Sequence, residues 1–320
     1  MKITLDSLKG VIYLYFMSAS TISTFQLFQM FPNQESARVY LEGRLWPEGA
    51  TCPTCAGRER ITTRKGGYYR CNQCKLDFTV RTATIFERSH VPLHKWIYAM
   101  YLLVTSRKGI SSMQLAKEIG ITQKSAWFVL QRLREACGND TTLLSGLVEI
   151  DEAYFGGKEK NKHESKKQRL GRGTVGKTAV IGMRERGGRT RAKVIRKVDG
   201  ITLHSTVHEN VEGGSEIHTD EHLGYQGLGN YYMHEVVNHG AGEYSRQGVT
   251  TNGMESVWAV MKRGILGVYH HTSAKHLGRY VDEFTFRLND GNVKVHTLDR
   301  LASFVAATSG VRLTYARLIA

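Results

Sequence analysis

Two pairs of cysteines restrict the fold of this chain more than any other feature of its sequence. Cys52 and Cys55 form one Cys-x-x-Cys pair, Cys71 and Cys74 form a second, and 15 residues lie between the pairs. Each pair lets two thiolates reach one ion from a tight turn, and four thiolates complete the tetrahedral site that Zn(II) prefers. The spacing therefore predicts a zinc ribbon with a closed, structural zinc site.

The rest of the cysteine usage supports metal over disulfides. The chain has 5 cysteines in 320 residues, and Cys137 stands apart from the two pairs. This usage indicates a reducing compartment, and a redox role is disfavoured because a redox Cys-x-x-Cys motif needs no second pair. Between the pairs, the segment from Arg64 to Gly67 suits a hairpin turn, and Tyr68 and Tyr69 suit a strand. Basic residues crowd this module and favour contact with DNA: Arg58, Arg60, Arg64, Lys65, Arg70 and Lys75.

The charge balance points to a polyanionic partner. Lys and Arg number 44 against 29 Asp and Glu, which gives a formal net charge of +15. Each phosphate that a Lys or Arg neutralises releases condensed counterions, so such an excess favours nucleic acid. A basic protein without a nucleic-acid role is the alternative. Hydrophobic residues make up 41% of the chain, but no apolar run reaches the roughly 18 residues that a membrane span needs.

Residues 111–136 predict a helix-turn-helix. The segment 111–120 begins with a serine suited to cap a helix and ends at a glycine suited to terminate one. A second helix follows over 123–136, and the shared core is expected to contain Leu115, Ile119, Ile121, Trp127, Leu130 and Leu133. Gln123, Lys124 and Ser125 would face outward where a recognition helix contacts base edges. An ordinary helical hairpin is the alternative, and the neighbouring ribbon and the charge favour DNA binding.

Three acidic residues lie at positions where they could converge. Asp151 is expected near the end of a strand that begins at Val148, and Asp220 ends a second short strand over 215–220. Glu255 opens a helix, and Lys262 follows two turns later on the same helical face. Hard cations such as Mg(II) prefer such oxygen ligands, and two ions could promote phosphoryl transfer. Taken singly, each acid is more often a solvated surface charge.

These motifs together resemble those of insertion-sequence transposases with an N-terminal zinc ribbon and a DDE-type catalytic domain. The resemblance covers about residues 23–290, and its most specific segments are the cysteine pairs, 148–163, 217–225 and 251–280. It implies an RNase H-like α/β fold, in which helices flank a mixed five-stranded sheet behind the ribbon and the helix-turn-helix. It also implies that Mg(II) or Mn(II) is the catalytic cofactor and that Asp151 and Asp220 are the first two metal ligands.

The third metal position has two candidates. Glu255 fits the resemblance best, because 34 residues separate it from Asp220 and Lys262 follows it. Related subgroups use Asn at this position, so Asn252 remains an alternative. The resemblance implies that Lys262 contacts DNA phosphate, and Arg263 is a further candidate for DNA contact. Glu152 and Glu221 stand beside the two aspartates and are expected to support them or to lie on the surface.

A basic loop follows the first catalytic strand. Residues 158–177 hold eight Lys or Arg and two Glu. Their polarity and glycines suggest a segment that orders on DNA, and a solvated loop is the alternative. The candidates for phosphate contact are Lys158, Lys160, Lys162, Lys166, Lys167 and Arg169.

The expected domains are an extension over 1–22, a helical segment over 23–50, the ribbon over 51–90, the helix-turn-helix over 91–140, the catalytic domain over 141–295 and a tail over 296–320. Met17 is an alternative start to Met1. The resemblance implies a bacterial cytoplasmic, nucleoid-associated homo-oligomer that cleaves and joins DNA at inverted repeats and at a target. A DNA-binding regulator with the ribbon and helix-turn-helix but no catalysis is the alternative function.

Overall fold

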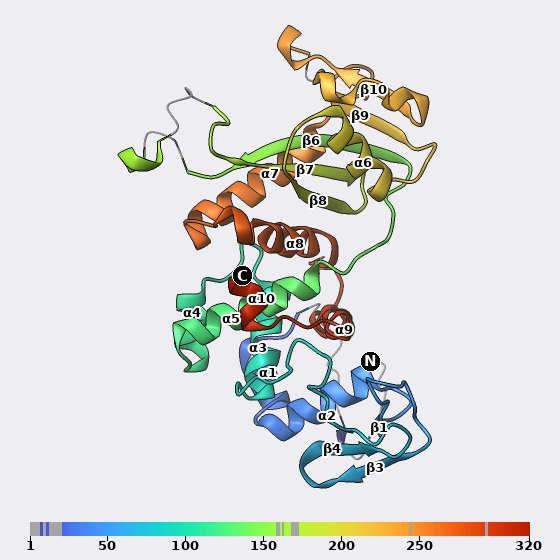
Figure 1. Ribbon diagram of the computed structural model, residues 1–320, viewed down its shortest axis with the longest axis vertical. Helices are drawn as coiled ribbons and strands as arrows, with labels where there is room; N and C mark the ends of the chain where they lie inside the picture. Colours follow the sequence, from blue (N-terminus) through green and yellow to red (C-terminus); the bar gives the residue numbers. More distant parts are fainter. Residues whose placement is uncertain are drawn as a thin grey trace. The chain divides into compact units, whose positions relative to one another are not determined.

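The computed structural model describes residues 7–8, 11–12, 21–157, 161, 163–167, 173–243, 245–291 and 294–320 (Figure 1). Contacts within the chain divide it into two compact units. The first contains the described residues up to Arg107 together with 112–136 and 291–320, and the second contains 108–111 and 137–290. No helix in these described ranges is both long and apolar enough to cross a bilayer.

The first unit begins with two short helices and a small sheet. Its helices α1 and α2 span Thr24–Met30 and Gln34–Leu45, and each starts with a capping box, formed by Ser23 and Asn33 respectively. The three-stranded antiparallel ribbon has the order β3-β4-β5, with bounds Ile61–Arg64, Tyr68–Cys71 and Asp77–Phe78. The predicted hairpin turn is present, because Gly66 and Gly67 both adopt positive φ between β3 and β4. A short antiparallel pair, β1 and β2, spans Ser7–Leu8 and Val11–Ile12.

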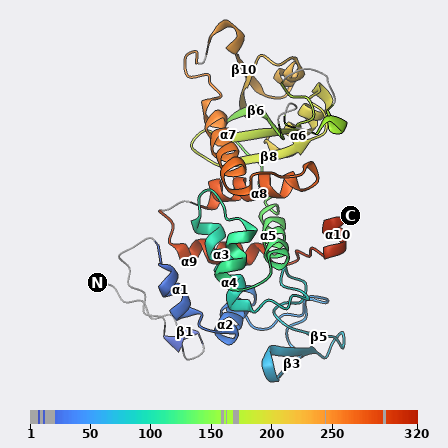
Figure 2. The same cartoon turned by 90° about the vertical axis from the view of Figure 1, so that its left-hand side faces the viewer.

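Helices complete the first unit (Figure 2). They are α3, α4, α5, α9 and α10, with bounds Leu93–Thr105, Ser112–Ile119, Gln123–Cys137, Thr297–Ala307 and Tyr315–Ile319. The predicted pair of helices over 111–136 is therefore present, and Gly120 between them has φ +60. The C-terminal segment belongs to this unit: Arg300 donates to the carbonyl oxygen of Val104 at 2.7 Å, and α9 packs against α2 and α3.

The second unit is built on a mixed five-stranded sheet in the order β10-β9-β6-β7-β8. Strands β6 and β7 and strands β7 and β8 pair antiparallel, whereas β9 runs parallel to β6 and β10 runs parallel to β9. The bounds of β6 to β10 are Leu147–Phe155, Thr178–Glu185, Thr190–Ile195, Glu216–Asp220 and Met233–Val237. This order and these directions are those of the RNase H-like fold, which confirms the predicted fold class.

Helices cover both faces of this sheet (Figure 1). Helix α6, Gly200–Asn210, packs on one face over a core that includes Val148, Ile150 and Ile217. Helices α7, Asn252–Gly264, and α8, Ala274–Asp290, pack on the other face over Ala153 and Phe155. Because side chains alternate along a strand, even-numbered residues of β6 face α6 and odd-numbered residues face α7.

Short turns connect these elements. The 3-10 turns η1, η3, η4, η5 and η6 span Lys65–Gly67, Glu164–Lys166, Leu223–Tyr225, Leu228–Asn230 and His239–Ala241. One turn of π-helix, η7, continues α7 over Ile265–Tyr269.

Helix α7 approaches the sheet most closely at Gly182 in β7. Gly182 pairs with Asp151 in the neighbouring strand β6. A Cβ atom at Gly182 would lie 2.2 Å from Cε of Met254 and 2.6 Å from Cζ2 of Trp258, both on α7. The missing side chain at this position therefore lets the ring of Trp258 lie against the strand that carries Asp151.

We expect Gly182→Ala to lower the free energy of unfolding by about 1–3 kcal/mol, because the added methyl group overpacks the contact between α7 and the sheet. Thermal unfolding followed by circular dichroism measures the effect. Gly213→Ala is the matched control, since a Cβ at Gly213 meets nothing within 4 Å. Equal melting temperatures for the two variants would contradict the close approach.

Candidate active site and zinc centre

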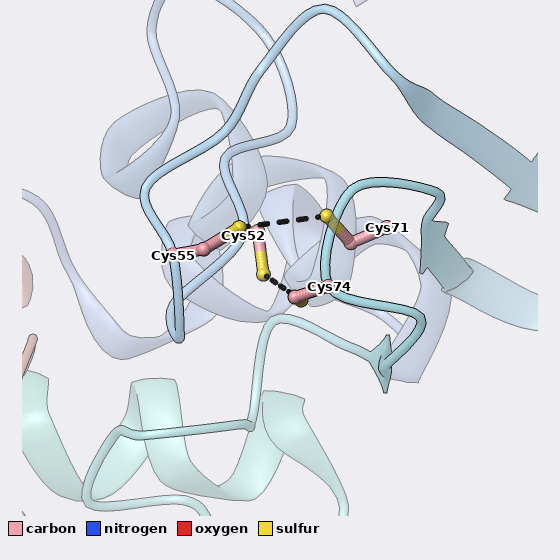
Figure 3. Close-up of side chains that lie close together, drawn as sticks. All are labelled: Cys52, Cys55, Cys71 and Cys74. Carbon is pink, nitrogen blue, oxygen red and sulfur yellow. Dashed lines mark hydrogen bonds between the residues drawn. The ribbon is translucent and has the colours of Figure 1, made fainter.

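The four paired cysteines meet in the ribbon (Figure 3). Their sulfur atoms all lie within 4.8 Å of one another. The Sγ atoms of Cys52 and Cys74 are 3.6 Å apart, as are those of Cys55 and Cys71. Zn–S bonds of about 2.3 Å in a tetrahedral site place sulfur atoms roughly 3.8 Å apart, so this cluster fits one zinc ion.

The protein around the cluster favours thiolates at some positions. Backbone N–H groups of Cys74 and Gln73 donate to Cys71 and lower the pKa of its thiol to about 6. Desolvation raises the pKa of the Cys74 thiol to about 12. The four thiols are thus unequal without a metal ion.

Aromatic packing joins the ribbon to α2. The ring of Trp46, which follows α2, lies 5.3 Å from that of Tyr69 and 5.6 Å from that of Phe78. The hydroxyl group of Tyr69 donates to Glu42 of α2 at 3.0 Å. These contacts bury one side of the ribbon, so α2 and the ribbon form one packed module.

In the second unit, Asp151 and Asp220 occupy the same level of neighbouring strands. The parallel register pairs Leu147 of β6 with Glu216 of β9, and its continuation places Asp151 beside Asp220. The expectation that Asp151 lies near a strand end was wrong, because β6 continues to Phe155. Strand β9 does end at Asp220, so β6 extends beyond the end of this neighbouring strand.

Glu152 joins the two aspartates. Carboxylate oxygens of Asp151, Glu152 and Asp220 all lie within 4.8 Å of one another. Glu152 belongs to the opposite face of β6 from Asp151, and the buried hydroxyl group of Tyr225 donates a hydrogen bond to it. Three carboxylates this close, without a cation between them, repel one another.

Helix α7 brings further groups to the aspartates. The indole Nε1 of Trp258 donates to Oδ2 of Asp151 at 2.9 Å. Glu255, three residues earlier on α7, lies near enough for its charge to raise the pKa of Asp151. Asn252 is exposed in the first turn, and its backbone N–H donates to the hydroxyl group of Thr250 at 3.1 Å. Lys262 and Arg263 are exposed near the end of the helix.

Burial shifts the proton affinity of these acids. It raises the pKa of Asp151 to about 6, and the charge of Asp220 acts in the same direction, whereas the N–H of Glu152 opposes it. Burial likewise raises the pKa of Glu152 to about 7, against the lowering effect of the hydrogen bond from Tyr225. Both carboxyl groups therefore bind protons more tightly in the folded protein than they would in water.

The candidate DNA-binding residues of α5 have partners within the first unit. The side-chain amide of Gln123 donates to the hydroxyl group of Ser112 at 2.9 Å. The hydroxyl oxygen of Ser125 lies 2.9 Å from that of Thr122. The ammonium group of Lys124 lies 5.1 Å from the ring centre of Tyr315. Gln123 and Lys124 are exposed, as the helix-turn-helix prediction requires.

Part of the basic loop lies outside the described residues. This holds for Lys158, Lys160, Lys162 and Arg169, and for the side chain of Lys166. Lys167 is described, and its ammonium group pairs with Glu164 at 2.7 Å.

Comparison with known proteins assigns the chain to a protein family. A family model described as the ISXO2-like transposase domain matches residues 143–289, and one described as the transposase zinc-ribbon domain matches residues 32–77. A protein of Halobacterium salinarum, described as an uncharacterized protein in transposable element ISH50, is 30% identical over 258 residues, which are 76% of this chain and 86% of the relative. The chain belongs to the ISXO2-like transposases.

The transposase also has a distant structural neighbour. A chain in the crystal structure of a pre-cleavage Mos1 transpososome is similar over 68% of this chain and 80% of its own length, with 11% identity and a TM-score of 0.27. The zinc-ribbon match begins at residue 32. It therefore includes α2, whose packing against the ribbon is described above.

The sequence analysis singled out Asp151 and Asp220, which the structure brings together, but it missed neighbours of these acids. Glu152 was expected to support the aspartates or to lie on the surface, and it is instead part of the cluster. Tyr225 and Trp258 were not singled out. Tyr225 stands five residues after Asp220 and Trp258 three residues after Glu255, so an aromatic residue close to each acid was the available signal.

We expect Glu152→Gln to stabilise the metal-free protein at alkaline pH. A carboxyl group whose pKa is raised on folding stabilises the fold fully below its unfolded pKa, near 4.5, and loses that contribution as pH rises through about 7. The neutral amide avoids this loss, with a gain of about 1–3 kcal/mol at pH 8. Urea unfolding in EDTA at pH 5 and pH 8 measures it. Parallel pH profiles for wild type and variant would reject the buried, shifted carboxyl group.

Proposed function

We propose that this protein is a DNA transposase that binds the ends of its element, cleaves their 3′ strands and joins them to target DNA. The membership in the transposase family supports the general class. The observation that carries the chemical proposal is the convergence of Asp151 and Asp220, from different strands, with Glu255 of α7 within electrostatic reach. A surface role would leave such acids apart and solvated.

In this proposal Asp151, Asp220 and Glu255 are the ligands of catalytic Mg(II) or Mn(II), and Asn252 is the alternative to Glu255. Two divalent ions, when bound, supply activation of a water or 3′ hydroxyl and stabilisation of the leaving oxygen. The raised pKa values of Asp151 and Glu152 support a cation site, because a divalent charge relieves the repulsion among buried carboxylates. Glu152 is placed to hold or orient the same ions.

The exposed cations of α7 would contact DNA. Lys262 lies two turns beyond Glu255, and helix geometry places both on one side of α7. Its ammonium group would bind a phosphate near the scissile bond, with Arg263 beside it. The segment 158–177, which follows β6, would add phosphate contacts through its lysines and arginines.

The first unit would recognise the element ends. Its four-cysteine cluster would hold a structural Zn(II) through Cys52, Cys55, Cys71 and Cys74, and the basic residues around the ribbon would face DNA. Gln123, Lys124 and Ser125 at the start of α5 would contact bases as a recognition helix does. Paired cleavage at two ends favours a homo-oligomer, and the substrate places the protein at the nucleoid in the bacterial cytoplasm.

We expect Asp151→Asn and Asp220→Asn each to reduce Mg(II)- or Mn(II)-dependent nicking of end-bearing DNA by at least about 1,000-fold, because each removes a ligand charge from the metal site. Binding of the same DNA, measured by gel shift, is expected to survive. Glu255→Gln compared with Asn252→Ala assigns the third ligand, since only the variant at the true position should lose cleavage.

Glu209→Gln, an exposed change on α6, is the matched control for loss of a negative charge. Wild-type cleavage by either aspartate variant would reject the assignment. A purified protein that binds the ends but never nicks them with either metal would instead be a DNA-binding regulator.

We expect Cys52→Ser to reduce the zinc content measured by mass spectrometry and to weaken end binding, because the ribbon loses one of its metal ligands and the fold that depends on it. Cys137→Ala is the control, since this thiol lies outside the four-sulfur cluster. Zinc content in Cys52→Ser equal to that of wild type would argue against the four-thiolate site.

A further inference from the structure

A second buried carboxylate lies on the α7 face of β6. Glu149 precedes Asp151 by two residues, so the two side chains share a face of the sheet. Glu149 is only 4% exposed. Its Oε1 accepts hydrogen bonds from Nε and Nη2 of Arg186, both at 3.1 Å, and its Oε2 accepts one from the backbone N–H of Gly253 at 2.6 Å.

Glu149, a residue of the sheet, caps the N-terminus of α7 because its carboxylate accepts the hydrogen bond from the N–H of Gly253. Gly253 is the second residue of α7, and the N–H groups of the first helical turn have no partner within the helix. A carboxylate at this end also interacts favourably with the helix dipole. Arg184 of β7 donates to the carbonyl oxygen of Gly253 at 2.9 Å, so the same peptide region is bound from two strands.

The segment that leads into α7 is bound at the same place. Arg186 donates to the carbonyl oxygen of Gly248 at 2.8 Å. The backbone N–H of Thr250 lies 3.3 Å from Nδ1 of His218, which is buried in β9. Strands β6, β7 and β9 thus each supply a side chain that binds residues 248–253.

Two contacts then fix α7 along β6. Glu149 binds Gly253, and Asp151 binds Trp258. Two residues of strand span about 6.6 Å, and five residues of helix span about 7.5 Å, so both contacts can form together only at one position of the helix along the strand. Glu255 lies between the two contact points.

Gly253 permits this close approach. A Cβ atom at this position would lie 2.4 Å from Oε2 of Glu149. Any other residue would therefore displace the carboxylate from the start of the helix.

We infer that Glu149 is a positioning residue of the active site: with Arg186, it holds the start of α7 at the position along β6 that brings Glu255 to Asp151 and Asp220. The inference rests on the proposed function for the identity of those metal ligands. In this inference Glu149 is not itself a ligand of the metal ions. It acts through the placement of α7.

A merely structural ion pair would behave differently from a positioning residue. Its loss would lower the melting temperature but leave the catalytic constants unchanged wherever the protein stays folded. Loss of a positioning residue changes the site in the folded protein as well. Support for metal ligands of this kind typically contributes about 10- to 100-fold in metal affinity or activity.

The test compares Glu149→Gln, Gly253→Ala and Arg186→Gln in the full chain, at a temperature where circular dichroism shows each to be folded. Ser256→Ala, an exposed change on the same helix, is the matched control. The readouts are kcat for nicking of end DNA, the Kd for that DNA, and the Mn(II) concentration that half-quenches the fluorescence of Trp258. Trp258→Phe assigns this signal among the four tryptophans of the chain.

We expect Glu149→Gln and Gly253→Ala to lower kcat roughly 10- to 100-fold and to raise the half-quenching Mn(II) concentration by a similar factor, with the DNA Kd changed less than about twofold. Arg186→Gln should have a smaller effect in the same direction, because the bond to Gly253 remains. Folded Glu149→Gln with wild-type kcat and wild-type Mn(II) response would overturn the inference.

If Glu149→Gln fails to fold, Gly253→Ala decides, because it removes no acidic side chain from the protein and raises helix propensity. Wild-type kcat and Mn(II) response in that variant would also overturn the inference. If wild type never nicks DNA, the proposed function fails, and Mn(II) quenching alone then decides. Weaker quenching in the variants supports the positioning role, and equal quenching rejects it.

Discussion

The packing of α7 against the sheet is the constraint on which the second unit of this transposase depends. Helix α7 buries Met254, Val257 and Trp258 in the core that it shares with the sheet. The same turns of this helix carry Glu255, the candidate third metal ligand. The glycine at position 182 allows the helix to approach, and the hydrogen bond from Trp258 to Asp151 connects the apolar contact to the acids. Core packing and site geometry are therefore one feature.

The cluster of acidic residues destabilises the folded protein. Carboxylates of Asp151, Glu152 and Asp220 are held together in a partly buried place, where desolvation and the neighbouring charges raise the pKa values of Asp151 and Glu152. The surrounding hydrogen bonds from Tyr225 and Trp258 offset only part of this cost. In the proposed metal site, divalent cations would offset this cost, because they would bind where negative charge is poorly compensated.

Much of the molecule followed from patterns that are local in sequence. Two Cys-x-x-Cys pairs predicted the ribbon, since each knuckle positions its own thiols. The periodicity of apolar residues predicted the positions of β9, α4, α5 and α7 to within a few residues. The position of Asp151 within its strand was misjudged, although the glycine pair Gly156 and Gly157 marks the end of β6 in the sequence. The role of α9 could not be predicted either, because its contacts with α2 and α3 join segments that are far apart in the sequence.

The sequence by itself determined the type of chemistry available: four thiolates at ribbon spacing, acids on two strands and at a helix start, and a large excess of positive charge. Only the tertiary structure decided which acids meet. It brought Glu152 into the cluster from the opposite face of β6, and it joined Glu149 to the start of α7 across 104 residues of chain. The physical reason is that side-chain chemistry and local periodicity depend on neighbouring residues in the sequence. Strand register and helix docking instead depend on how surfaces that are distant in the sequence pack together.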